Sequence, residues 1–297
     1  MVDLSNTTLI IDSNSLAYIA KYSMRGLSWN DFPTGVIFGF FSQLKELANH
    51  FQTNKFIFSW DSKKSFRRGL YPEYKAQRRE RRKKRTDQEV IEDNLAFEQF
   101  YQLRRIFLPK FGFKNIFIRT GYESDDIMAS LVINTPKELS KDKLIIVTTD
   151  DDLFQVLNRC DLYHPSTKRL MTKKSFEEEF EINPLQWVEI KQLAGCTSDN
   201  VKGIEGVGEK TALKYLKNLL KSGKIYARIL KEKEKVIKQN APLVCLPFAG
   251  VEPEEGFKIE KESFFSNDFC DICDQLGFKS FLKQDEYQKW VALFDMK

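Results

Sequence analysis

The feature that most constrains the fold is a set of four short apolar segments, each of which runs into carboxylates. In chain order the segments are 8–11, 55–60, 115–118 and 144–147. Between them lie apolar patterns with the spacing of helices, at about 34–51, 88–108 and 124–134. Apolar strands that alternate with helices predict an α/β fold with a mainly parallel sheet and helices on both faces.

The acids that follow these strands predict a shared site. Ligands bind outside the carboxyl ends of strands in such sheets. One Asp after a strand is ordinary turn chemistry, but here all four strands end this way, and the sequence has no GxGxxG or GxxxxGK[ST] loop. We therefore expect seven carboxylates to converge at this edge: Asp12, Asp61, Glu123, Asp125, Asp126, Asp150 and Asp152.

An all-oxygen cluster of this kind indicates a hard divalent cation. Carboxylates suit Mg²⁺ or Mn²⁺, and with only two histidines in the chain a zinc or iron site is disfavoured. An EF-hand is excluded at Asp150, because the alternation of ligands stops at Phe154 and no Gly stands at the sixth position. Two such ions about 4 Å apart can stabilise the attacking and leaving oxygens of phosphodiester hydrolysis.

The positive charge of the chain is concentrated in one segment. Residues 63–85 hold twelve Lys and Arg against two Glu, a net charge of +10, so that the remaining residues carry −5 of the overall +5. Such runs are usually solvated, partly disordered surface. Here Phe66, Tyr71 and Tyr74 alternate with the basic residues, which favours contact with nucleic acid.

Length and composition limit the remaining possibilities. A chain of 297 residues can bury one large core, or one core and a small satellite domain. No apolar run approaches the roughly 20 residues that span a bilayer, and residues 1–5 show no secretory signal. Five cysteines, including a lone CxxC at 270–273 without further zinc ligands, fit a reducing cytosol. We expect a cytoplasmic protein that does not bind membranes.

Seven motifs in order resemble the 5′-nucleases, the family of phage 5′→3′ exonucleases and flap endonucleases and of the equivalent domain of bacterial DNA polymerase I. The resemblance runs from about residue 8 to about 215. The motifs are IDSN (11–14), WD (60–61), FR leading to YPEYKAQR (66–78), GYESDD (121–126), TDDDL (149–153), GCTSDN (195–200) and GIEGVGEKTA (203–212).

The resemblance implies a fold, a domain division and an activity. The fold would be PIN-like, with residues 1–185 as the catalytic domain and a basic helical arch inserted at about 62–100. Residues 186–297 would form a helix-hairpin-helix DNA-binding subdomain with a C-terminal extension. The activity would be that of a monomeric 5′→3′ exonuclease and flap endonuclease, which removes primers or flaps from DNA in replication and repair.

The resemblance also assigns roles to individual residues. Two Mg²⁺ ions, which Mn²⁺ can replace, would be held by one set of acids around the first ion and another around the second. The first set is Asp12, Asp61, Glu123 and Asp125, and the second is Asp150, Asp152 and Asp199, with Asp126 nearby through water. Asp125 and Asp126 would thus be part of the catalytic centre, whereas Asp151 would point away.

Basic residues of the arch would contact the DNA. Lys75 and Arg78 match the residues that approach the scissile phosphate, so both are catalytic candidates. The other DNA-binding candidates of this segment are Arg67, Tyr74, Arg79, Arg81 and Arg82. Contacts of this kind are independent of sequence and sensitive to salt.

Residues 203–212 predict a glycine hairpin that leads into a helix. Backbone N–H groups at a helix N-terminus bind phosphate, and the resemblance implies a duplex-binding element with a bound K⁺. Gly206, Val207, Gly208 and Lys210 are the candidates. A simple packing corner between two helices explains the glycines equally well.

One departure from the family pattern affects the predicted second ion. The family has Asp at the second position of the 195–200 motif, and this chain has Cys196. A thiol is a poor ligand for Mg²⁺, so we expect weaker binding of the second ion. A branched-DNA-binding protein with a weakened or inactive second metal site is the alternative. A PIN-like ribonuclease is disfavoured by the basic insertion and the hairpin.

Overall fold

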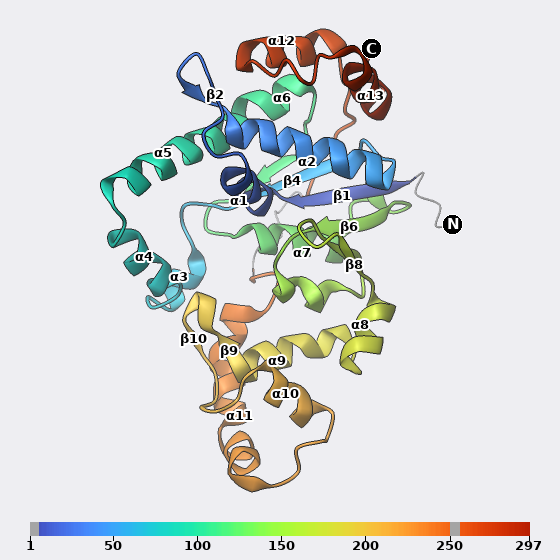
Figure 1. The fold of residues 1–297 in the computed structure, drawn as a ribbon. Helices are drawn as coiled ribbons and strands as arrows, with labels where there is room; N and C mark the ends of the chain where they lie inside the picture. Colours follow the sequence, from blue (N-terminus) through green and yellow to red (C-terminus); the bar gives the residue numbers. More distant parts are fainter. Residues whose placement is uncertain (1–5, 250–255) are drawn as a thin grey trace.

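A six-stranded, mainly parallel sheet forms the centre of the molecule (Figure 1). The structure, a computed structural model, describes residues 6–249 and 256–297; residues 1–5, where we predict no secretory signal, lie outside the described part. The strand order is β5-β4-β1-β6-β7-β8, and only the β7–β8 pair is antiparallel. The strands are β1 (Thr7–Asp12), β4 (Phe56–Trp60), β5 (Ile116–Ile118), β6 (Lys143–Val147), β7 (Asp161–His164) and β8 (Arg169–Met171).

Alternating side chains of the central strands build two separate cores. Leu9 and Ile11 of β1 belong to one cluster, while Ile10 belongs to the other, as expected from the period of two along a strand. The first face is covered by α1 (Ser13–Ser23), α2 (Gly35–Phe51) and α6 (Leu108–Phe111), and the second by α7 (Ser124–Ile133) and α8 (Lys173–Phe180). The predicted α/β fold with helices on both faces is therefore confirmed.

The segment between β4 and β5 forms a helical arch at one side of the sheet (Figure 1). It contains α3 (Phe66–Leu70), α4 (Ala76–Lys83) and α5 (Asp87–Gln102). No residue of α4 is buried, which agrees with the prediction that this basic run is solvated. The predicted helix at 88–108 is interrupted, because a π-helical turn (Leu103–Phe107) separates α5 from α6, which has Pro109 in its first turn.

A helical subdomain lies at the opposite end of the molecule from the C-terminal helices (Figure 1). It consists of α9 (Trp187–Ala194), the short hairpin β9–β10 (Gly195–Cys196 and Val201–Lys202), α10 (Glu209–Leu216) and α11 (Gly223–Val244). Gly195 has φ +73°, and a Cβ there would come within 2.3 Å of the Val201 carbonyl oxygen. Only glycine therefore lets this hairpin turn directly off the end of α9.

The C-terminal helices, which we predict as an extension of the 186–297 unit, pack on the sheet domain. Helices α12 (Ser266–Leu276) and α13 (Gln284–Phe294) contribute Phe269, Trp290 and Phe294 to the same core as α2 and α6. The physical reason is a dense aromatic contact, since the Phe111 ring lies 5.1 Å from Phe294 and 5.9 Å from Trp290, centroid to centroid. The helical subdomain therefore lies between two parts of the sheet domain in the sequence.

A small antiparallel hairpin, β2 (Ser28–Trp29) and β3 (Phe32–Pro33), joins α1 to α2. Among the described residues, no helix is both long enough and apolar enough to cross a membrane.

Candidate active site

Four aspartates meet at the carboxyl edge of the sheet without a basic partner, and we call them the inner acids. They are Asp12, Asp61, Asp125 and Asp150. Asp12 ends β1, and Asp61 follows β4 directly; Asp125 opens α7, and Asp150 follows β6. In the described part of the chain, none of the four carboxylates forms an ion pair with Lys or Arg.

Backbone and hydroxyl donors orient these acids. Asp12 accepts hydrogen bonds from the Ser15 N–H at 3.1 Å and the Thr148 hydroxyl at 3.0 Å. Asp61 accepts one from the Ser124 N–H at 2.8 Å, across the start of α7. These bonds fix where each carboxylate lies but add no positive charge to balance it.

The inner acids raise one another's pKa values. Burial, then the charge of Asp61, raises the pKa of Asp12 to about 7. Burial also raises the pKa of Asp125 well above its usual range, and the charges of Asp150, Asp12 and Asp61 add to this. Asp150, at the outer side of the cluster, has its pKa raised to about 6 by desolvation and by Asp152. Carboxylates under this mutual repulsion form a site that favours a cation.

Three further acids each pair with a basic side chain, and we call them the paired acids. Glu123 accepts from the Lys75 ammonium at 2.8 Å. Asp199 accepts from the Arg78 guanidinium at 2.7 Å, and Asp152 lies 2.7 Å from the Lys191 ammonium. Burial by itself would raise the pKa of Glu123, but the charge and hydrogen bond of Lys75, together with Arg67 and the Tyr74 hydroxyl, lower it below its usual value.

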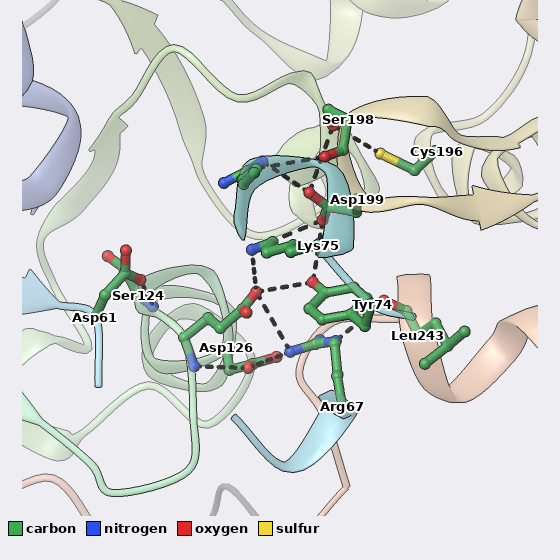
Figure 2. A network of polar contacts seen from close by, with 12 residues as sticks. Asp61, Arg67, Tyr74, Lys75, Ser124, Asp126, Cys196, Ser198, Asp199 and Leu243 are labelled. Atoms are coloured by element: carbon green, nitrogen blue, oxygen red, sulfur yellow. Dashed lines mark hydrogen bonds and ion pairs between the residues drawn. The ribbon is translucent and has the colours of Figure 1, made fainter. Parts of the chain in front are cut away.

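The base of the arch is held against the paired acids (Figure 2). The Tyr74 hydroxyl lies between Glu123 at 2.9 Å and Asp199 at 3.0 Å, and the Lys75 N–H donates to the Asp199 carbonyl at 2.8 Å. Tyr74 is only 2% exposed. The structure thus differs from the prediction that Tyr74 contacts DNA, because its hydroxyl is engaged in bridging two acids.

Asp126 and Arg67 form a buried, bidentate ion pair (Figure 2). Asp126 has no exposed surface, and its two oxygens accept from the Arg67 guanidinium at 2.6 and 2.7 Å and from the N–H groups of Phe248 and Glu123. Arg67 is 3% exposed and also donates to the Leu243 carbonyl at 3.0 Å.

This pair corrects two predictions. With every strong acceptor position filled, Asp126 has no oxygen left for a cation or a bridging water. Arg67 is enclosed by protein and cannot reach a phosphate. Both residues instead fasten the start of the arch and residues 243–248 to the first turn of α7, beside Glu123.

The donor set fits a divalent cation, and the fit rests on the inner acids. Their oxygen ligands and unbalanced charge match the chemistry of Mg²⁺ or Mn²⁺. In the described residues, no three Asp, Glu, His or Cys side chains are arranged as a ready metal site. The paired acids face Lys75, Arg78 and Lys191 instead.

The remaining basic candidates of the arch differ in accessibility. Arg81 and Arg82 are exposed, and the Arg82 guanidinium lies 5.9 Å from the Phe97 ring centroid. Arg79 is partly buried and donates to the Tyr74 and Pro72 carbonyls, both at 2.8 Å. Arg79 therefore closes the turn between α3 and α4.

The predicted hairpin residues lie together at the start of α10. Gly206 has φ +80°, the Val207 N–H donates to the Ile204 carbonyl at 2.9 Å, and Gly208 precedes the first residue of the helix. Val207 is buried in the core below, while Gly206, Gly208 and Lys210 are exposed. The element is thus both a packing corner and an accessible helix N-terminus.

The comparisons with known proteins agree with this geometry. The sequence model described as "5'-3' exonuclease, N-terminal resolvase-like domain" matches residues 7–181, and the one described as "5'-3' exonuclease, C-terminal SAM fold" matches residues 182–243. The chain belongs to the 5′-3′ exonuclease family.

Relatives in this family include separate exonucleases and parts of polymerases. The 5′-3′ exonuclease of Mycoplasmopsis pulmonis is 28% identical over 299 residues, which cover 95% of this chain and 94% of that protein. The thermostable DNA polymerase I of Thermus thermophilus is 32% identical over 223 residues, 72% of this chain but 25% of the polymerase. The chain therefore spans about a quarter of the length of such polymerases.

Solved structures show the same fold. The 5′-exonuclease of phage T5, solved with zinc ions, has a TM-score of 0.69 at 24% identity and covers 81% of this chain and 90% of its own. Flap endonuclease-1 of Methanococcus jannaschii has a TM-score of 0.56 at 14% identity, covering 99% and 93%.

In this member of the 5′-3′ exonuclease family, Cys196 lies beside the paired acids. Its Sγ is 3.1 Å from the Ser198 hydroxyl, and its pKa is raised by burial and by the charges of Asp152 and Asp199. The thiol therefore stands next to Asp152 and Asp199, where the family pattern has a further carboxylate.

Sequence reasoning missed Lys191 and Thr148, which contact acids of the candidate site. Thr148 had a usable signal, because it stands between the strand and the acids of the 149–153 motif. Lys191 had none, since it reads as one polar residue among others in an amphipathic helix.

Proposed function

We propose that this chain is a divalent-metal-dependent 5′-nuclease, acting as a 5′→3′ exonuclease and flap endonuclease on DNA in replication and repair. The observation that carries the proposal is the position of the inner acids. Four unbalanced aspartates stand beside two basic residues, Lys75 and Arg78, which already lie at their border. Hydrolysis of a phosphodiester by this mechanism needs positive charge near the phosphate oxygens and carboxylates that hold the metal ions.

The proposed ions are two Mg²⁺, which Mn²⁺ can replace. Asp12, Asp61 and Asp125 would hold the first ion together with Glu123, while Asp150, Asp152 and Asp199 would surround the second. When bound, the ions supply an activated water and stabilise charge on the leaving oxygen. We expect Cys196 to make Mn²⁺ the better ion at the second position, since Mn²⁺ accepts softer ligands than Mg²⁺ does.

The chain's own side chains would orient the substrate. Lys75 and Arg78 would exchange Glu123 and Asp199 for the scissile phosphate and stabilise the negative charge that develops there. Arg81 and Arg82 on the exposed face of α4 would hold the unpaired 5′ strand by its phosphates. Gly206, Gly208 and Lys210 would bind the duplex backbone at the start of α10, and a K⁺ ion bound there would add to this contact with the phosphates.

Related structures support DNA as the partner. The T5 flap endonuclease has been solved in a complex with DNA and metal ions, and the catalytic core of Rad2 in a complex with a DNA substrate. We place the chain in the cytosol as a monomer that acts on such DNA.

Cleavage of a 5′-flap duplex in Mg²⁺ and in Mn²⁺ tests the proposal. We expect Asp125→Asn to lower the rate by about a thousandfold or more, since a metal ligand supplies several kcal/mol of transition-state stabilisation. Lys75→Met should lower it by about a hundredfold. The matched control is Asp151→Asn, because Asp151 is an exposed acid of the same loop and forms no ion pair with Lys or Arg in the described part of the chain.

Two results would contradict the nuclease. One is a wild-type rate equal to that of Asp125→Asn in both metals, and the other is an equal loss in Asp151→Asn. Tight binding of flap DNA without cleavage would favour the second candidate, a branched-DNA-binding protein, for which the presence of Cys196 among the paired acids is the supporting observation.

A further inference from the structure

One buried lysine connects the two predicted functional elements. Lys191 lies on α9 and is 7% exposed. Its ammonium is 2.7 Å from Asp152 Oδ1 and 2.5 Å from Glu209 Oε1, and it lies 5.4 Å from the centroid of the Trp187 ring. A side chain this enclosed cannot extend to a substrate, so its charge acts inside the protein.

The two carboxylates that share Lys191 belong to different sites. Asp152 is one of the paired acids at the sheet edge. Glu209 is the first residue of α10, between Gly208 and Lys210 of the hairpin, and its side chain is 49% exposed. Both acids line a groove of about 610 Å³, together with Lys191, Cys196 and Gly208.

We propose that Lys191 is a positioning residue that couples metal binding at Asp152 to duplex binding at the hairpin. This inference rests on the proposed function and identifies how its two binding events influence each other. A single ammonium balances two carboxylates, so a change at one of them changes the electrostatic balance at the other.

The sign of the coupling follows from Coulomb's law. A divalent cation at Asp152 satisfies that carboxylate and repels the ammonium, so the charge of Lys191 then serves Glu209. If Lys191 did not neutralise Glu209, the Glu209 carboxylate would repel a DNA phosphate at the start of α10. Metal binding therefore favours duplex binding, and by linkage duplex binding favours metal binding by the same factor.

The test compares DNA affinity with and without a divalent cation. The dissociation constant of a labelled flap duplex is measured by anisotropy in chelator and in Ca²⁺ at matched ionic strength, and a gel verifies that the DNA is intact. We expect wild type to bind about three- to tenfold more tightly in Ca²⁺, a typical coupling factor. In Lys191→Met this ratio should fall to about one.

Glu209→Gln provides an independent variant that keeps the lysine. Because the side chain is half exposed, the fold should tolerate it. We expect the ratio to fall to about one here as well, with tighter DNA binding in chelator because the repelling charge is gone. Mn²⁺ titration followed by electron paramagnetic resonance, with and without DNA, should show the same factor from the metal's side.

Lys174→Met is the matched control, since Lys174 pairs with Glu178 on the exposed surface of α8 and should leave the ratio unchanged. A wild-type ratio of one, or a ratio that persists in both Lys191→Met and Glu209→Gln, would overturn the coupling. If the protein cleaves flap DNA but the ratio persists in both variants, the nuclease is retained and only the coupling is rejected. If the ratio falls to about one in both variants but the protein does not cleave flap DNA, the coupling is retained and the nuclease is rejected.

Discussion

The inner acids and the paired acids differ in how their negative charges are balanced. Both groups collect carboxylates at one edge of the sheet. Glu123, Asp152 and Asp199 each have a lysine or arginine within 2.8 Å, whereas the inner acids have only neutral hydrogen-bond donors and raised pKa values. The difference makes the inner acids the better candidates for binding a cation from outside the chain, while each paired acid already has a basic partner within the protein.

Asp125 and Asp126 are neighbours on α7, but only Asp126 has a basic partner, Arg67. The two residues therefore allow a direct comparison of an unpaired and a paired acid. Asp126→Asn leaves the Arg67 guanidinium buried without a counter-charge, which typically costs about 3–5 kcal/mol. We expect this loss in the free energy of unfolding measured by urea denaturation. The double variant Arg67→Met/Asp126→Leu should recover much of it; if it does not, the ion pair is not the cause.

Glu262 separates the effect of burial from that of mutual repulsion. Its carboxylate belongs to neither group of acids. It accepts hydrogen bonds from the N–H groups of Lys114 and Asn115 and from the Asn115 side-chain amide. Burial nevertheless raises its pKa to about 7 from the usual 4.5. The folded state then binds a proton more tightly than the unfolded state does.

Stability should therefore decrease as the pH rises from about 4.5 to 7. The decrease attributable to Glu262 amounts to about 3 kcal/mol, and Glu262→Gln should remove it. The measurement is the free energy of unfolding of both proteins at several pH values. Equal pH dependence in the two proteins would contradict the assignment.

Asp125→Asn should stabilise the metal-free protein even though it abolishes activity. It removes one charge from a group of four that repel one another, so the melting temperature in chelator should rise by a few degrees. Glu123→Gln should have the opposite sign, because it removes the nearer of the two carboxylates that pair with Lys75, at 2.8 Å, and leaves only Asp199 at 3.7 Å. If both variants shift the melting temperature in one direction, the distinction between inner and paired acids is wrong.

Cys196→Asp should produce the smallest effect. A further carboxylate beside Asp150, Asp152 and Asp199 raises the negative charge at the proposed second ion, and ligand charge increases cation affinity. We expect Mn²⁺ affinity to increase about three- to tenfold, measured by titration, with Cys196→Ser unchanged as the control. An equal increase in both variants would show that the charge is irrelevant.

The sequence was sufficient for the sheet and for the edge where the acids meet. Each predicted strand is a strand of the sheet, because continuous apolar segments such as 8–11 can be buried only between two layers of helices. It was not sufficient to separate Asp125 from Asp126. Adjacent acids look equivalent in a motif, and only the packing of Arg67 and residues 243–248 distinguishes them.

Long-range contacts account for the other differences. The packing of α12 and α13 on the sheet domain could not be predicted, because their aromatic residues do not show in the sequence which core they join. Strands β7 and β8 are short and have exposed or intermediate residues at most positions, so they lack the apolar signal that revealed the central strands.

The docking of α12 and α13 on α2 and α6 has a consequence for the order in which the protein can fold during synthesis. Phe41 and Phe111 emerge from the ribosome early, but the rings that cover them, Phe269, Trp290 and Phe294, are translated more than 150 residues after Phe111. Through most of translation one layer of the sheet domain therefore exposes an aromatic surface, a condition that favours chaperone binding.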